Sequence, residues 1–294
     1  MRPGLSMGVA QVSQSIIPQA AGLARLQTPG ALRVLAVSSG KGGVGKTSVA
    51  VNLAMALAMD GLQTLLVDAD LGLANVDVQL GLDPQRTLAH LLDGSATLHD
   101  LILDAPGGLK VLPATSGARR MAQLGAAEIG ALIRAINTYA EPLDAVVVDT
   151  AAGISESVTE FVRAAQETVV VVCDEPASIT DAYALIKVLR REYGLQRFRV
   201  LANMVHDAQH GRDLFDKIQR VADRFLDVGL DYMGAIPQDE YVRRAVRRQS
   251  AVVDAYPGSR AAQSFRALAQ AVRRWPAPPP PGAGLPLQPG AGHA

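Results

Sequence analysis

The feature that most constrains this chain is a glycine-rich loop that lies between an apolar run and a helical pattern. The apolar run is "RVLAVS", the loop is "GKGGVG", and the helical pattern begins "KTSVAVNLAMAL". Gly40, Gly45, Lys46 and Thr47 match the phosphate-loop pattern G-x-x-x-x-G-K-[ST], which needs a strand before it and a helix after it. A chance glycine-rich turn is the alternative, and the correct flanks disfavour it. The residues predicted to contact a nucleotide here are Gly40, Lys41, Gly42, Gly43, Val44, Gly45, Lys46, Thr47 and Ser48.

The loop predicts a division of labour among these residues. Its backbone N–H groups would point at a triphosphate, and the helix that follows adds partial positive charge at its N-terminus. Lys46 would span the β- and γ-phosphates, while Thr47 would offer its hydroxyl to Mg²⁺.

The rest of the chain repeats the alternation of strand and helix. Most of the apolar runs are continuous, as expected when helices cover both faces of a parallel sheet. We therefore predict an α/β fold with one doubly wound, mostly parallel sheet over residues 31–275. The predicted strands are 33–38, 63–68, 109–114, 144–149, 167–174, 197–203 and 231–237, and the main predicted helices are 47–59, 128–139, 178–193 and 211–225. Residues 1–30 form an N-terminal extension, and the Pro- and Gly-rich segment 276–294 is expected to be a disordered tail.

Bulk composition narrows the class of protein. The formal net charge is zero, so any contact with nucleic acid or anionic lipid must come from a local patch. A single cysteine, Cys173, excludes an intrachain disulfide and any metal site built from paired cysteines within one subunit. No run reaches the roughly 18 apolar residues that a membrane span needs, and the N-terminus does not read as a signal peptide. We expect a cytoplasmic protein.

Lys41 is a second lysine within the phosphate loop. It follows the first glycine, where its side chain is poorly placed to share the phosphates that Lys46 already faces. It could instead reach the phosphates of a second subunit and stabilise charge during phosphoryl transfer, as an arginine finger does. A solvated surface lysine is the alternative reading.

With this lysine, "GKGGVGKT" resembles the deviant Walker A motif of the MinD/ParA family. The resemblance implies a P-loop NTPase fold of the MinD type, in the SIMIBI class. It also implies a weak, regulatory ATPase that uses ATP and Mg²⁺ and forms a homodimer around ATP. In that family the extra lysine, here Lys41, acts across the dimer. Lys41 is therefore predicted to be catalytic together with Lys46, which contacts the phosphates of its own subunit.

Two acidic motifs agree with this reading. "LLVDADLGLANVDVQLGL" places Asp68 and Asp70 at the end of a strand, where open sheets bind ligands. One carboxylate could lie near Mg²⁺ and the other could orient the attacking water. By resemblance Asp70 has the second role, with Asn75 in the same switch segment. Helix caps or turn formers are the alternative for both motifs.

The second acidic motif is "AVVVDTAAG", a hydrophobic strand that ends in Asp149, which is the Walker B pattern. The predicted metal ligands are therefore Thr47, Asp68 and Asp149. The usual family form has Pro before Ala-Gly where this chain has Ala151, which leaves the stiffness of the second switch open.

Recognition of the base rests on resemblance alone. Asn203, Pro237 and Asp239 correspond to positions that border the adenine, although as isolated features they could be ordinary turn residues. Guanine would usually need an N-K-x-D motif, and "NMVH" does not supply it. ATP is thus the expected nucleotide.

Longer stretches resemble the FlhG/FleN branch of the family, which controls flagellar number and placement. They include "VVDTAAGISESVTEFVRAAQE", "CDEPASITDAYALIKVL" and "DRFLDVGLDYMGAIPQDEYVRRAV". The resemblance implies binding to a flagellar transcriptional activator of the FleQ kind, to the FlhF GTPase, or to both. Members often carry an N-terminal helix that stimulates FlhF. In the family that helix reads Asp-Gln-Ala-x-x-Leu-Arg. The corresponding segment here is "PQAAGLARL" (18–26), which has Pro18 in place of the Asp and has Arg25 displaced by one position. A frayed terminal helix without a partner is therefore the alternative.

Two helices leave alternatives open. "YVRRAVRRQ" (241–249) carries a basic stripe that could bind DNA as ParA-type proteins do, and we favour a solvated face or a protein-docking patch. The segment 259–275 places Phe265, Leu268, Val272 and Trp275 on one face. That face could be a weak peripheral anchor at the inner membrane or cell pole, and we favour packing against the domain core. The competing function is a DNA-partition or cargo-positioning ATPase. A third possibility is a metabolic enzyme of ATP-dependent amidation or carboxylation on the same fold, but this sequence has no visible substrate-binding insertion.

Overall fold

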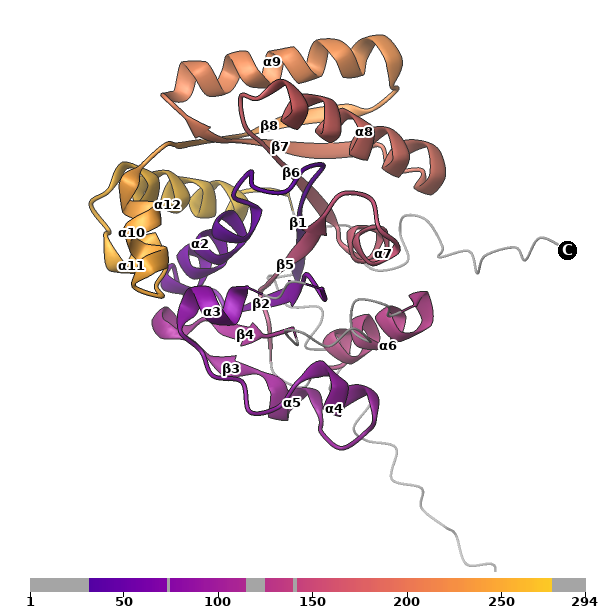
Figure 1. The fold of residues 1–294 in the computed structure, drawn as a ribbon, viewed down its shortest axis with the longest axis vertical. Coiled ribbons are helices and arrows are strands. Elements are labelled where there is room, and N and C mark those ends of the chain that lie inside the picture. The colour runs from indigo at the N-terminus through magenta and orange to yellow at the C-terminus, as the bar shows by residue number, and fades with distance from the viewer. Residues whose placement is uncertain (1–31, 73–74, 115–124, 140–141, 277–294) are drawn as a thin grey trace, which may run out of the picture.

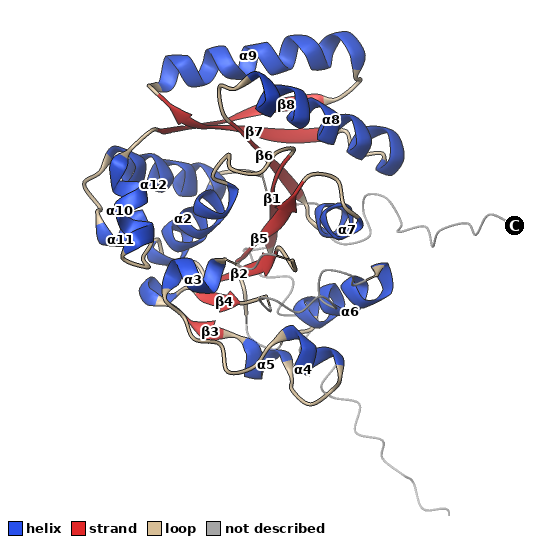
Figure 2. Cartoon of the chain, in the orientation of Figure 1, coloured by secondary structure: helices blue, strands red, loops and turns tan. Residues whose placement is uncertain are grey.

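The computed structural model describes residues 32–72, 75–114, 125–139 and 142–276, so the N-terminal extension and almost all of the C-terminal tail lie outside it. Within these residues the strands form one eight-stranded sheet with the order β3-β4-β2-β5-β1-β6-β7-β8 (Figures 1 and 2). All neighbouring strands are parallel except β3 and β4. The strands are β1 Arg33–Ser39, β2 Thr64–Ala69, β3 Leu103–Asp104, β4 Lys110–Leu112, β5 Ala145–Ala152, β6 Glu167–Val172, β7 Arg197–Val205 and β8 Gly229–Pro237. The predicted doubly wound α/β fold is therefore confirmed.

Helices cover both faces of this sheet, because successive residues of each buried strand point to opposite sides. In β1, Leu35 and Val37 join the core beneath α2 and α12, whereas Ala36 joins the core beneath α7, α8 and α9. The helices are α2 Lys46–Met59, α3 Val76–Leu80, α4 Leu88–Leu92, α5 Leu98–Leu101, α6 Ala126–Asn137, α7 Glu156–Ala164, α8 Pro176–Tyr193, α9 Ala208–Phe225, α10 Glu240–Arg247, α11 Val252–Ala255 and α12 Arg260–Arg273, with a 3₁₀ turn η1 at Pro106–Gly108.

Every strand predicted from the sequence is present, with ends that differ by at most three residues. β3 was not predicted. It has two residues and pairs antiparallel at the edge of the sheet, so it is too short to give a periodic pattern.

The apolar face of α12 packs against the core. Phe265, Leu268 and Val272 are at most 6% exposed, and Trp275 packs against the same cluster. The packing interpretation of segment 259–275 is confirmed, and these side chains are not available to a membrane in this structure. No helix in the described part of the chain is both long enough and apolar enough to cross a bilayer.

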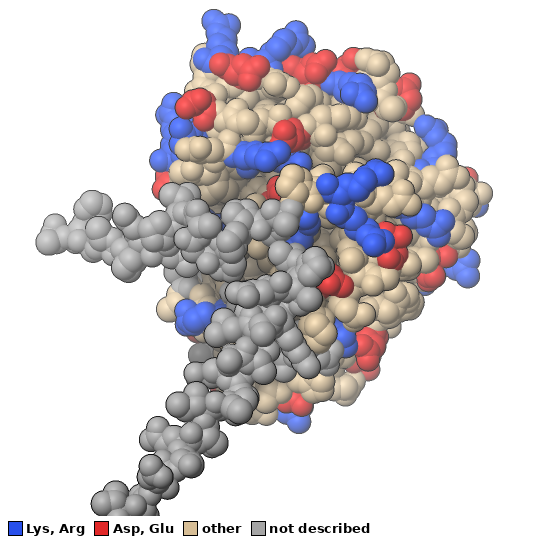
Figure 3. All heavy atoms as spheres, turned by 180° about the vertical axis from the view of Figure 1, so that it is seen from behind, with Lys and Arg blue, Asp and Glu red and all other residues tan. Residues whose placement is uncertain are grey.

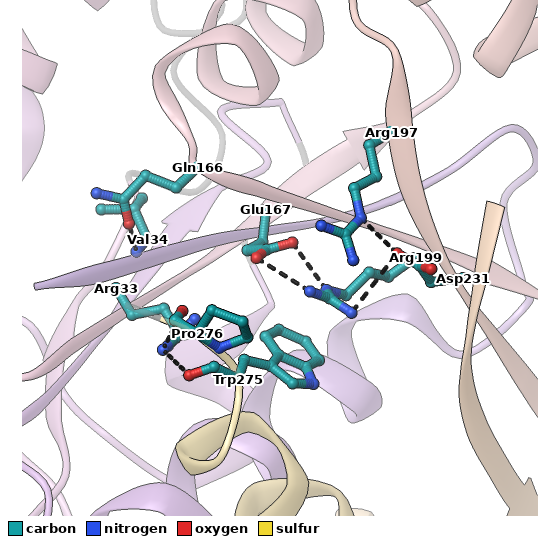
Figure 4. Close-up of polar contacts among 9 residues, drawn as sticks. All are labelled: Arg33, Val34, Gln166, Glu167, Arg197, Arg199, Asp231, Trp275 and Pro276. Atoms are coloured by element: carbon teal, nitrogen blue, oxygen red, sulfur yellow. Dashed lines mark hydrogen bonds and ion pairs between the residues drawn. The ribbon is translucent and has the colours of Figure 1, made fainter. Parts of the chain in front are cut away.

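The amino-terminal edge of the sheet carries a cluster of paired charges (Figure 4). Arg199 forms two hydrogen bonds with Glu167, of 2.7 and 3.1 Å, and its guanidinium carbon lies 3.5 Å from the centre of the Trp275 ring. Arg33 donates to the carbonyl oxygens of Trp275 and Pro276 at 3.0 and 3.1 Å. These contacts hold the end of α12 beneath the starts of β1, β6 and β7. We call Arg33, Glu167, Arg199 and Trp275 the amino-edge cluster.

Charges are mixed on the surface seen from behind. Outside the grey atoms, basic and acidic side chains alternate without a large area of one sign (Figure 3). This distribution agrees with the formal net charge of zero.

Candidate active site

The predicted phosphate-binding and acidic residues meet at the carboxyl edge of the sheet. β5 lies between β1 and β2, and in its pairing with β2, Asp68 stands directly opposite Asp149. The loop 40–45 joins β1 to α2 at the same edge. The fold thus brings together segments more than 100 residues apart in the chain.

Lys46 and Asp149 form a buried ion pair. The Nζ–Oδ1 distance is 2.7 Å, and the two side chains are 8% and 1% exposed. Burial raises the pKa of the Asp149 carboxyl, while the neighbouring Lys46 ammonium and the Thr47 hydroxyl act in the opposite direction. The Oδ2 atom of Asp149 is buried and has no hydrogen-bond partner within the described chain. A buried acceptor of this kind is costly unless something fills the position beside it.

Asp68 accepts backbone N–H groups from the segment that follows it. Its Oδ1 accepts from Asp70 at 3.0 Å, and its Oδ2 accepts from Asn75 at 3.1 Å and Val76 at 3.2 Å. Burial raises the pKa of Asp68 to about 7, and the charge of Asp149 adds to the rise. Within the described chain, two buried carboxyl groups therefore lie close together beside a single ammonium, that of Lys46, and their joint ionisation is unfavourable without further positive charge.

Two glycines of the loop are needed for different reasons. Gly45 has φ 82°, in the left-handed region, and a Cβ on it would lie 2.5 Å from Nδ2 of Asn203. Gly40 is needed for close packing, because a Cβ there would lie 2.1 Å from backbone atoms of Asp181 in α8. The sequence pattern suggested only a phosphate-cradling role for Gly40, and nothing local to it indicates α8 as its neighbour.

Of the three residues predicted to border the base, Asn203 contacts the loop, while Pro237 and Asp239 lie at the end of β8 and at the start of α10. Asn203 donates from Nδ2 to the carbonyl oxygen of Val44 at 2.8 Å, and so holds the loop from β7. Pro237 ends β8. Asp239 caps α10 by accepting from the Tyr241 N–H, and it also accepts from the Ala261 N–H, both at 3.0 Å. Contact of the three with adenine stays a prediction.

Lys41 pairs with a different carboxylate from the one that Lys46 contacts. Its ammonium donates to Oε2 of Glu175 at 2.7 Å, and the two side chains are 37% and 58% exposed. The hydrogen bond to Glu175 raises the pKa of Lys41. Glu175 is thus a neighbour of the loop that the sequence analysis missed, since only the fold brings the start of α8 to Lys41.

These residues fit a magnesium–nucleotide group. Mg²⁺ at phosphate sites is usually held by one or two carboxylates together with phosphate oxygens and water. The Asp68 and Asp149 carboxylates and the Thr47 hydroxyl supply such a set, and the unpartnered Oδ2 of Asp149 is an acceptor awaiting a donor or a cation. Lys46 and the glycine loop lie beside them for the phosphates. Asp70, which is half-buried, follows directly, at the end of β2.

Comparison with known proteins matches this site to an established family. A family model described as the CobQ/CobB/MinD/ParA nucleotide binding domain matches residues 35–252, which include every site residue named above. The antiactivator FleN of Pseudomonas aeruginosa is 57% identical over 250 residues, covering 85% of this chain and 89% of that protein. The flagellum site-determining protein YlxH of Helicobacter pylori is 34% identical over 243 residues, covering 82% and 81%. The septum site-determining protein MinD from Pyrococcus horikoshii, solved in complex with Mg-ADP, is 27% identical with a TM-score of 0.70, covering 83% of this chain and 96% of that chain.

Proposed function

This chain belongs to the CobQ/CobB/MinD/ParA nucleotide-binding family, and on that premise we propose that it is an ATP-switched dimer that limits flagellar number and placement. It is an ATPase that works with ATP and Mg²⁺. The observation that carries the flagellar part is its 57% identity to an antiactivator named FleN, supported by the second likeness to a flagellum site-determining protein.

Within one subunit the chain's own groups bind and orient the nucleotide. Lys46, already positioned by Asp149, supplies a positive charge to the β- and γ-phosphates. Mg²⁺, when bound, is held by Thr47, Asp68 and Asp149 and offsets the negative charge of the phosphates. Asp70 orients the water that attacks the γ-phosphate, so that ATP and water give ADP and phosphate.

Lys41 acts on the nucleotide of the partner subunit. Its exposed side chain is held by an exposed glutamate outside the Lys46 pocket, so it can change partners at little cost when a second copy docks. ATP is then part of the dimer interface, and only ATP-loaded chains form the partner-binding surface.

We assign the dimer two candidate partners, a flagellar transcriptional activator of the FleQ kind and the FlhF GTPase. The N-terminal extension 1–30, with its "PQAAGLARL" segment, is the proposed contact to the GTPase and lies outside the described residues. The domain 31–275 is the switch, and 276–294 is a tail. The protein works in the cytoplasm, with recruitment to the inner membrane or cell pole through its partners.

The test is genetic and uses nucleotide-state variants. Deleting the gene should give cells with too many flagella, and overproduction should give none. Lys46→Ala should behave as the deletion, because it cannot hold ATP. Asp70→Ala should behave as overproduction, because it keeps Mg-ATP and stays dimeric. A deletion strain with normal flagellar number and normal swimming would contradict the proposal.

A DNA-partition ATPase is the second candidate, and one surface feature favours it. Arg243 and Arg247 lie one turn apart on α10, are exposed, and form no ion pair in the described part of the chain. By contrast, Arg244 pairs with Glu240, and Arg248 donates to the Tyr256 hydroxyl. ATP-dependent binding to random DNA that falls steeply with salt and is lost in Arg243→Ala/Arg247→Ala would support partition.

A further inference from the structure

α3 is a short helix held at both ends by side chains from other elements. It spans Val76–Leu80, five residues, which is too short to be stable alone. At its N-terminus, the N–H groups of Asn75 and Val76 donate to Asp68, the candidate metal ligand. At its C-terminus, the carbonyl oxygen of Val78 accepts from Nε2 of Gln249 at 3.1 Å. The helix therefore connects the nucleotide site to the end of α10.

Gln249 has a left-handed backbone conformation that is unusual for a residue with a side chain. It lies two residues past the end of α10 with φ 52°, and it is one of two non-glycine residues with positive φ among the residues described. Glycine is favoured at this position after a helix, because the left-handed conformation strains any residue with a Cβ. The glutamine side chain must therefore form contacts that offset the cost of this conformation, which glycine would not carry.

The side chain closes the C-terminus of α3. The carbonyl oxygen of Val78 accepts the N–H of Gly81 at 3.3 Å, and the Gln249 amide adds a second, side-chain donor to the same oxygen. Its Cβ also packs beside Gly81, the left-handed residue that ends α3, where a Cβ on Gly81 would lie 3.2 Å away. The contact is long-range, since Gln249 and Val78 lie 171 residues apart in the chain.

We propose that Gln249 is a positioning residue for ATP hydrolysis, acting through α3. By holding the C-terminus of α3 it keeps the N–H groups of Asn75 and Val76 on Asp68, whose other oxygen accepts the N–H of Asp70. The inference rests on the proposed role of Asp70 in orienting water. In this way Gln249 and α3 connect the end of α10 to Asp68 in the nucleotide site.

The experiment separates positioning from folding with two variants of the full chain. Gln249→Glu keeps the shape of the side chain and removes the donor. Gln249→Gly removes the side chain and relieves the backbone strain, so it should unfold at the same or a higher temperature than the wild type. Both should lower kcat for Mg-ATP about two- to thirtyfold, the usual range for residues that couple two sites, with ATP affinity unchanged within about twofold.

The matched control is Gln263→Glu. Gln263 is also an exposed glutamine whose amide donates to a backbone carbonyl, that of Gly258 at 3.3 Å, but it does not contact α3. Gln263→Glu should leave kcat unchanged, which shows that adding a carboxylate to the surface is not the cause.

Asp70→Ala, measured in the same assay, distinguishes two kinds of failure. If Asp70→Ala abolishes hydrolysis while both Gln249 variants keep the wild-type kcat, the inference is wrong and the role of Asp70 stands. If Asp70→Ala hydrolyses ATP normally, the proposed role of Asp70 fails, and with it the route assigned to Gln249. A kcat loss in Gln249→Gly accompanied by a lower unfolding temperature and weaker ATP binding would also overturn positioning.

Discussion

The two edges of the sheet differ in how completely their buried carboxylates are paired. At the carboxyl edge, Asp149 shares one oxygen with Lys46 and leaves the other without a partner in the described chain, beside a second carboxyl at Asp68. At the amino edge, Glu167 gives both oxygens to Arg199, whose guanidinium also stacks on Trp275. One nitrogen of Arg33 is the exception at the amino edge, since it is buried without a hydrogen-bond partner among the residues described.

From this difference we expect the carboxyl edge to serve nucleotide binding and the amino edge to stabilise the fold. The carboxyl edge keeps raised carboxyl pKa values and a buried acceptor without a partner in the described chain, both of which a cation would relieve. The amino edge has used its charges to join β1, β6 and β7 to the end of α12. Variants at the two edges should therefore affect different quantities, and four predictions test this division.

The largest effect is expected for Lys46→Ala at the carboxyl edge. It removes charge-assisted bonds to the phosphates, so ATP affinity should fall by about 100-fold or more in calorimetry. Lys41→Ala is the control, and should keep ATP affinity while losing stimulated hydrolysis and weakening the ATP-dependent dimer. Equal losses of affinity in both variants would mean that the two lysines do not have separate roles.

Glu167→Ala at the amino edge should act on stability alone. It removes the carboxylate that forms two hydrogen bonds with the largely buried guanidinium of Arg199 and, among the residues described, leaves only the more distant carboxylate of Asp231, at 3.8 Å. The free energy of unfolding should therefore fall by about 2–4 kcal/mol in urea titration. ATP affinity should not change. Glu160→Ala, which breaks the more exposed pair with Arg163, should cost less than about 1 kcal/mol. A loss of ATP affinity in Glu167→Ala would break the comparison.

Trp275→Leu should have a smaller effect in the same direction. It keeps an apolar group under the sheet but removes the ring against which Arg199 stacks, so a loss of about 1–2 kcal/mol is expected. Denaturant unfolding measures it, and Trp275→Leu combined with Glu167→Ala should cost less than the sum, because both act on Arg199. Additive losses would mean that the stack and the ion pair are independent.

Glu175→Gln should have the smallest effect. It removes the negative charge beside Lys41 while keeping an amide oxygen that can accept from the ammonium, and it leaves the Lys46–Asp149 pair intact, so the ATP affinity of the monomer should be unchanged. Dimerisation in ATP, followed by light scattering, should strengthen by no more than about fivefold, as expected for an exposed pair. Weaker dimerisation would show that Glu175 helps Lys41 in the dimer rather than restraining it.

The carboxyl edge was largely predictable from sequence, and the amino edge was not. The loop residues, Asp68 and Asp149 follow from local patterns of strand, loop and helix, so the fold and the convergence of these residues at one edge could be inferred. Glu175, Gln249 and the neighbour of Gly40 could not, because each contact depends on how α8 or α10 packs. Arg199, Glu167 and Trp275 carry no motif at all, and their pairing depends on strand order. The helix predicted at 178–193 begins at Pro176, and the hydroxyl oxygen of Ser178 accepts the N–H of Cys173.

The hydrogen bonds from Arg33 to Trp275 and Pro276 place the two ends of the described core side by side. A chain whose ends meet can be rejoined by a short linker and opened elsewhere, because circular permutation succeeds when the termini are close and the new break falls in an exposed turn. The turn at Gly194, exposed after α8 and far along the chain from the phosphate loop, is a suitable point for such a break. A permuted chain would keep the order of β1, the loop and α2 intact, and it would allow reporters to be attached at the new ends beside α8 instead of beneath the sheet.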